Sequence, residues 1–124
     1  MTGIASRLII VIAGLMGAAG VALAAAAAHG GDASRLSPAS SMLLFHAPAI
    51  LAALALVQQG VLPPMLGRVA IAGLLLGTAL FSGDLTWRHF MSSALFPMAA
   101  PIGGTLLIAS WLALAIAALW PQRR

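Results

Sequence analysis

The sequence predicts an all-α membrane protein, a bundle of four transmembrane helices with both termini in the cytoplasm. Hydrophobic residues make up 62% of the chain and charged residues only 6%, whereas an ordinary soluble domain carries about a quarter charged residues. Mean hydropathy is +1.09. Four apolar runs follow one another, each long enough to cross the hydrocarbon core. We expect one domain over residues 1–124, with helices at about 6–28, 38–59, 67–88 and 98–120.

The few charged residues also exclude several classes of protein. The chain has six Arg, two Asp, no Lys and no Glu, and the Arg are scattered singly apart from Arg123 and Arg124. This pattern is not that of a nucleic-acid surface, nor of a peripheral helix with one strongly charged face. The chain has no Cys, which excludes disulfides, thiol redox chemistry, iron–sulfur ligation and Cys-based zinc sites.

The first helix is predicted by the uncharged run of residues 8–28, which lies between Arg7 and His29. At about 1.5 Å per residue this run reaches roughly 30 Å. A secretory signal peptide is the alternative, but the run is longer than a usual signal core and three more apolar runs follow. Its small residues, including Gly17, Gly20 and the Ala-rich stretch 24–28, should face protein because they let helices approach closely.

The second helix should begin with Ser37 as N-cap and Pro38 at the first helical position. It should end at Gln59, before a turn over residues 60–64. Pro48 inside it cannot donate a backbone hydrogen bond. We therefore expect a kink that frees the carbonyl of Leu44.

The third helix should carry Trp87 as an interfacial anchor, and its Gly73 and Gly77 form a G-x-x-x-G pair. We expect this pair to pack within the chain rather than at a dimer seam. The entry to the fourth helix is interrupted by Pro97 and by residues 101–104. Residues 90–100 are therefore expected to form an interfacial or broken segment before the main helix.

Orientation follows from the distribution of Arg, because basic residues near helix ends favour the cytoplasm. With four spans, both termini share a side with the turn after the second helix. That side carries Arg7, Arg68, Arg123 and Arg124, whereas Arg35 and Arg88 on the other side are each accompanied by an Asp. Both termini are therefore predicted to be cytoplasmic.

Five short motifs recur in the order and at the depths of a known family. They are Ala28-His29-Gly30, Phe45-His46-Ala47, Leu80-Phe81-Ser82-Gly83, Pro101-Ile102-Gly103-Gly104 and Ser110-Trp111. With them the chain resembles the domain of unknown function 423 family from about residue 14 to residue 120. That family consists of small four-span bacterial membrane proteins similar to transmembrane protein 256 of animals. The resemblance implies a multi-pass protein of the bacterial cytoplasmic (inner) membrane. It assigns no activity to the chain.

Two positions depart from the family pattern. The family commonly has a second Ser where this chain has Asp84, and usually lacks the proline found here at Pro48. The resemblance therefore assigns no role to the carboxylate at position 84.

Ionisable residues gather in the half of the bundle away from the termini. His46, Asp84 and Arg88 all fall there, and Asp84 and Arg88 share one helix stripe with Gly73 and Gly77. Charges inside a membrane usually mark a function. One hypothesis is an outer-leaflet vestibule that binds a lipid headgroup, a small solute or an ion. Its candidate residues are His29, His46, Asp84, Arg88, Gly103 and Gly104.

The alternative interpretation is structural. Asp84 and Arg88 are four residues apart and would neutralise each other, and His46 would bond the carbonyl freed by Pro48 or a neighbouring helix. His29 would then have a loop or capping role. The corresponding function is an accessory subunit that packs against another membrane protein through the small-residue faces of the first and third helices.

We expect no enzyme, no cofactor and no metal. The sequence has no paired carboxylates, no Ser/His/Asp arrangement and no phosphate loop, and His29, His46 and His89 lack the spacing of a helical metal pair. Trp111 is expected to pack in the core. The expected partners are the lipid bilayer and either a lipid or a membrane protein, not nucleic acid. The oligomeric state stays open.

Overall fold

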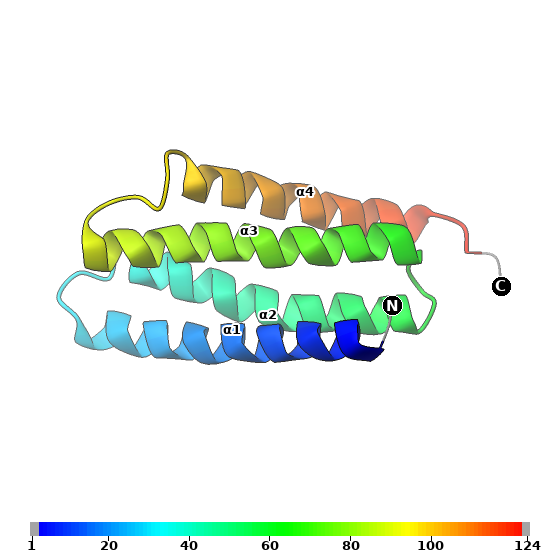
Figure 1. Ribbon diagram of the computed structural model, residues 1–124, viewed down its shortest axis with the longest axis horizontal. Helices are drawn as coiled ribbons and strands as arrows, with labels where there is room; N and C mark the ends of the chain where they lie inside the picture. Colours follow the sequence, from blue (N-terminus) through cyan, green and yellow to red (C-terminus); the bar gives the residue numbers. More distant parts are fainter. Residues whose placement is uncertain (1–2, 123–124) are drawn as a thin grey trace.

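The computed structural model describes residues 3–122, which form four helices and no strand. They are α1 (Gly3–His29), α2 (Leu36–Gln58), α3 (Pro64–Met91) and α4 (Ala99–Leu119). All four are long and apolar enough to cross a membrane, so the predicted class of an all-α, four-span membrane protein is confirmed. Loops 30–35 and 92–98 lie together at what we name the loop end; the opposite, terminal end carries turn 59–63 and the chain ends (Figure 1).

The start of α2 and the end of α3 differ from the expected ones. Ser37 is not the N-cap of α2: its backbone N–H donates to the carbonyl of Ala33 at 3.0 Å, so helical turns begin earlier, and Arg35 takes the N-cap position. Residues 90–100 form no separate helix. Instead α3 continues to Met91, because Ser92 in the left-handed conformation (φ 58°) closes it by donating its N–H to Arg88.

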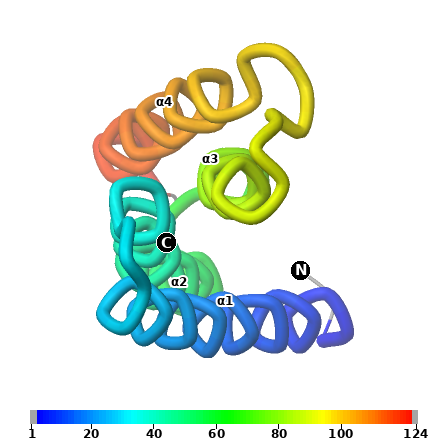
Figure 2. Tube along the Cα trace, turned by 90° about the vertical axis from the view of Figure 1, so that its left-hand side faces the viewer, coloured from blue at the N-terminus to red at the C-terminus, as the bar shows by residue number. Residues whose placement is uncertain are grey.

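The helices pack in chain order, α1 on α2, α2 on α3 and α3 on α4 (Figure 2). Within α1 only Ser6, Ala13 and Gly20 are buried. They are seven residues apart, which is the spacing of one contact line along a partner helix. The expectation that the Ala-rich stretch 24–28 faces protein is wrong for the single chain, where it is exposed or half-buried, because α1 touches α2 along that line alone.

Glycines allow the helices to approach closely at two crossings. Between α3 and α4, a Cβ at Gly77 would lie 2.9 Å from the carbonyl oxygen of Gly103, and a Cβ at Gly73 would overlap Ser110. Between α1 and α2, a Cβ at Gly20 would lie 2.8 Å from Leu44. Contacts this short leave no room for a larger residue. Gly17 is looser, since its nearest neighbour, Ala47, would be 4.0 Å away.

The core is centred on α2 and α3. Its largest fully buried apolar side chains include Ile50 in α2 and Ile71 and Leu74 in α3. The described residues of α2 remain helical through Pro48. The core therefore holds α2 and α3 firmly, with α4 fixed to α3 by the glycine crossing and α1 the most loosely attached helix.

Candidate functional site

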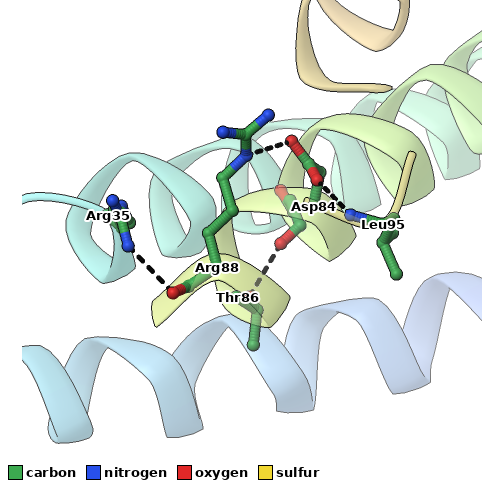
Figure 3. A network of polar contacts seen from close by, with 6 residues as sticks. Arg35, Asp84, Thr86, Arg88 and Leu95 are labelled. Atoms are coloured by element: carbon green, nitrogen blue, oxygen red, sulfur yellow. Dashed lines mark hydrogen bonds and ion pairs between the residues drawn. The ribbon is translucent and has the colours of Figure 1, made fainter. Parts of the chain in front are cut away.

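A half-buried ion pair lies near the loop end of α3 (Figure 3). Asp84 is fully buried, and its Oδ2 accepts a hydrogen bond of 2.8 Å from Nε of Arg88. Its Oδ1 accepts one of 2.9 Å from the backbone N–H of Leu95 in loop 92–98. Both carboxylate oxygens thus have a partner, as a charge removed from water requires.

Asp84 also lies close to the start of α4. The N-cap of α4, Met98, has a left-handed backbone (φ 68°) and no side-chain cap. The backbone N–H of Ala100, in the first turn of α4, interacts favourably with the Asp84 carboxylate. One carboxylate of α3 therefore binds loop 92–98 and puts a negative charge near the start of α4, where the helix dipole favours it.

The guanidinium group of Arg88 is hydrogen-bonded to Asp84 through Nε. Its side chain is 35% exposed, and within residues 3–122 the two Nη nitrogens have no hydrogen-bond partner. The carbonyl oxygen of Arg88 accepts hydrogen bonds from Nη1 of Arg35 at 2.8 Å and from the N–H of Ser92 at 3.0 Å. Arg35 thereby places a second positive charge at the C-terminus of α3, where the helix dipole favours it (Figure 3).

His46 is buried between α2 and α4. Its Nδ1 lies 2.8 Å from the carbonyl oxygen of Met42, and its Nε2 lies 3.1 Å from the indole Nε1 of Trp111. Because the carbonyl can only accept and the indole can only donate, this geometry fits the neutral ring protonated at Nδ1. Of the two partners expected for His46, the neighbouring helix is found, since Trp111 lies in α4. The carbonyl that His46 binds is that of Met42 and not that of Leu44.

Trp111 is not a core residue, contrary to expectation. It is 47% exposed, and its ring meets His46 edge to face with centroids 5.9 Å apart. A tryptophan at a helix surface can bury its N–H in a hydrogen bond while most of its ring faces lipid.

The candidate residues fall into separate places. His46 and Gly104 line a pocket of about 300 Å³ together with Met42, Phe81, Leu107, Ile108 and Trp111. Gly103 is buried at the α3–α4 crossing, and His29 is exposed at the end of α1. Within residues 3–122, no hydrogen bond joins His46 to the Asp84–Arg88 pair. Among these candidates, Arg88 combines a side chain fixed at Nε with Nη nitrogens that have no partner within residues 3–122.

Hydroxyl groups fasten the helices to one another. Ser40 Oγ donates to the carbonyl of Gly20 in α1 at 2.7 Å, and Ser82 Oγ donates to that of Ala39 in α2 at 2.8 Å. Every buried side-chain nitrogen and oxygen in the described chain has a partner. No three His, Cys, Asp or Glu residues among those described could hold a metal ion together.

Loop 30–35 contains the second carboxylate. Oδ1 of Asp32 accepts a hydrogen bond of 2.9 Å from the backbone N–H of Ser34. This bond favours the charged form and lowers the pKa of Asp32 below its ordinary 3.8. The carboxylate should thus stay charged at any physiological pH.

The fold and this site define a small integral membrane protein with four membrane-crossing helices and an ion pair near one end. The chain belongs to the family described as "Protein of unknown function (DUF423)", whose model matches residues 8–104. It is similar to a "UPF0382 membrane protein" of Haemophilus influenzae, with 34% identity over 99 residues, which are 77% of this chain and 80% of the relative. No solved structure matches.

These matches confirm the resemblance to this family, but the matched residues differ from the expected range of about 14 to 120. The match begins at residue 8, earlier than expected, and ends at residue 104, before the Ser110-Trp111 motif. His46 and Asp84 lie inside the matched residues, whereas Trp111 lies outside them. The family and the relative support a membrane protein of a family whose function is described as unknown, with a relative in a bacterium.

Proposed function

We propose that this protein is a non-enzymatic lipid-binding protein of the bacterial inner membrane, and that Arg88 binds the phosphate of a lipid headgroup at the loop end. One observation carries the proposal: a fully buried carboxylate, Asp84, fixes Nε of Arg88, whose side chain is 35% exposed and whose Nη nitrogens have no partner within residues 3–122. Asp84 is a positioning residue here, since its own oxygens are occupied.

The chemistry of the guanidinium group supports a phosphate ligand. Arg has five N–H donors in a planar fork, and one of them is used on Asp84. The donors on the two Nη nitrogens remain for an anion, and their geometry suits two phosphate oxygens at once. Arg35 adds positive charge at the same end of α3.

The depth of Arg88 supports a lipid as the source of the phosphate. In an α3 that runs from residue 64 to residue 91, Arg88 is about ten residues beyond the midpoint. This corresponds to about 16 Å along the helix axis, close to the half-thickness of roughly 15 Å at which headgroups begin. The basic residues at the terminal end favour that end for the cytoplasm, and this orientation supports a place for Arg88 in the outer leaflet.

The proposal is tested by lipid binding to detergent-solubilised protein, with phosphatidylglycerol as probe. Arg88→Gln should weaken binding by about tenfold or more, because a charge-assisted hydrogen bond contributes roughly 1.5–3 kcal/mol. Arg68→Gln is the matched control, since it removes one exposed Arg at the terminal end. If the Arg68 variant loses as much as the Arg88 variant, or neither loses binding, the proposal is wrong.

The source of the phosphate is separated by a second titration with inorganic phosphate. A lipid site should bind phosphatidylglycerol far more tightly than free phosphate, because the acyl chains keep the headgroup at the membrane surface. Equal affinities for both probes, both sensitive to Arg88→Gln, would assign the site to free phosphate instead.

A second function is favoured by the exposure of α1. This helix of 27 residues buries only Ser6, Ala13 and Gly20, and its Ala-rich stretch offers a smooth face on which another membrane helix could pack closely. An accessory subunit would use this face. Cross-linking in native membranes from a single Cys at Ala25 should then capture a partner, whereas the same Cys at Ala115 in α4 should not.

A further inference from the structure

Loop 92–98 folds back along α3 instead of passing over its end. A Cβ at Gly103 would lie 2.6 Å from the backbone nitrogen of Phe81, so these two residues lie at the same level of the bundle. α4 begins four residues before Gly103, which is about 6 Å. Its start is therefore near the level of Asp84, roughly 10 Å short of the end of α3. Figure 1 shows α4 starting short of the point where α3 ends.

Three features hold the loop in this folded-back path. The backbone N–H of Leu95, in the middle of the loop, donates to Oδ1 of Asp84 at 2.9 Å. Ser92 and Met98, at its two ends, both have left-handed backbones, with φ of 58° and 68°. Residues with a side chain keep this conformation only where the surrounding structure imposes it. The return of the loop toward Asp84 is therefore built into the fold.

The level of Asp84 gives the depth of the loop in a membrane. In an α3 that runs from residue 64 to residue 91, Asp84 is between six and seven residues beyond the midpoint, or about 10 Å along the axis. Leu95 shares this level, which is about 5 Å below the boundary at roughly 15 Å where headgroups begin. Apolar faces of interfacial helices are buried to a similar depth, about 5–10 Å into the boundary between headgroups and acyl chains.

The loop exposes two kinds of group at this depth. The side chains of Leu95, Phe96 and Met98 are apolar and are 44%, 42% and 60% exposed. The backbone N–H groups of Ser93, Phe96 and Met98 donate no hydrogen bond in the part of the chain that the structure describes. Whatever surrounds the loop must therefore offer both apolar contact and hydrogen-bond acceptors.

These two requirements together select the lipid interface. Pure hydrocarbon has no acceptor for a backbone N–H, and a transmembrane helix uses its backbone carbonyls within itself. The interface offers acyl chains beside lipid oxygens and water. We propose that loop 92–98 inserts into the lipid interface of the leaflet at the loop end, with its exposed apolar side chains on acyl chains. This insertion requires no anionic headgroup, so phosphatidylcholine tests it independently of Arg88.

The first test is electron paramagnetic resonance of spin-labelled protein in phosphatidylcholine vesicles. The chain has no natural Cys, so Phe96→Cys and, as the control at the same end, Gly31→Cys each carry one label. A Cβ at Gly31 meets nothing within 4 Å. The label at position 96 should be accessible to oxygen, which concentrates in hydrocarbon, and protected from a water-soluble nickel chelate. The label at position 31 should show the opposite preference.

Two results would overturn the proposal. A label at position 96 that is as accessible to the nickel chelate as the label at position 31 would place the loop in water. A label at position 96 that is protected from both reagents would assign the loop to a contact with protein instead of lipid.

A second test uses the natural sequence, in case Phe96→Cys alters the loop. In NMR spectra of the protein in phosphatidylcholine nanodiscs, the Phe96 ring should show cross-peaks to lipid methylene protons. The amide of Phe96 should exchange with water faster than that of Leu95, which is bonded to Asp84. Equal exchange of both amides, or ring cross-peaks to a second copy of the chain and none to lipid, would overturn the proposal.

Discussion

At the scale of single residues, Asp84 is the most constrained group in the molecule. A carboxylate withdrawn from water is costly unless each oxygen is compensated. Here one oxygen binds Arg88 and the other binds the backbone of Leu95. The side chain thus links α3 to a loop that begins only at residue 92, and orients the guanidinium group that we propose as the phosphate ligand.

Asp84→Asn should lower the free energy of unfolding by about 1–3 kcal/mol, because the amide keeps the shape but loses the charge-assisted bond. Reversible unfolding in mixed detergent micelles measures the change. Asp32→Asn is the control, since that carboxylate is exposed in loop 30–35. Equal losses in both variants would contradict the role given to Asp84.

The sequence predicted only some of the contacts in this site. The Asp84–Arg88 pair follows from a spacing of four residues on one helix, and was expected as one interpretation. The bond from Leu95 joins residues eleven apart across an irregular loop, and the bond from Trp111 to His46 joins residues 65 apart. No local pattern encodes either partner, because both depend on how the helices are placed in space.

At the scale of helices, the apolar runs predicted all four spans, because a membrane segment must be long and uncharged over its whole length. The ends were harder to predict. α3 runs to Met91, beyond the expected Arg88, since the left-handed Ser92 and not a proline ends it. The helix crossings depend on which residue of another helix each glycine meets, as Gly77 meets Gly103 and Gly20 meets Leu44, and no local pattern in the sequence gives that partner.

The α3–α4 crossing offers two adjacent glycines with different surroundings. A Cβ at Gly103 would lie 2.6 Å from the backbone nitrogen of Phe81, whereas one at Gly104 would only touch the ring of Phe81 at 3.7 Å. Gly103→Ala should therefore destabilise the protein by about 1–3 kcal/mol. Gly104→Ala should be neutral or stabilise it by up to about 1 kcal/mol, because Ala favours helix. Thermal unfolding in detergent compares them, and equal effects would contradict the close crossing.

The loop between α1 and α2 should respond to acid through Asp32. Its pKa is lowered in the folded chain by the N–H of Ser34, so the stabilisation is present above the unfolded pKa and is lost as pH falls through the folded pKa. The amide resonance of Ser34 should accordingly titrate with a midpoint below 3.8, and Asp32→Asn should abolish the titration. A midpoint above 3.8 would contradict the hydrogen bond.

At the scale of the whole molecule, the protein is an open arrangement of helices. α3 packs on both α2 and α4, whereas α1 joins through α2 and leaves an apolar groove beside α3. Polar atoms fasten the helices internally, and the exposed surface is mostly apolar. The apolar surface was expected of a membrane protein from the composition. The groove was not, because it depends on how far apart α1 and α3 lie.

The orientation of the molecule can be tested because the chain has no natural Cys. A membrane-impermeant thiol reagent applied to intact spheroplasts should label Gly31→Cys in loop 30–35 and leave Val61→Cys in turn 59–63 unlabelled. Opening the cells should make Val61→Cys reactive. The reverse pattern would place the loop end in the cytoplasm and contradict the predicted topology.

We propose above that Arg88 binds a lipid phosphate at the loop end. Solid-state NMR of the ¹⁵N-Arg-labelled protein in phosphatidylglycerol vesicles measures it most directly, through dipolar coupling between guanidinium nitrogen and lipid ³¹P, with Arg88→Lys used to assign the signal. If Arg88 binds a lipid phosphate, its two Nη nitrogens should show strong coupling to phosphorus. A correctly folded protein whose Arg88 nitrogens show no coupling to phosphorus would contradict it.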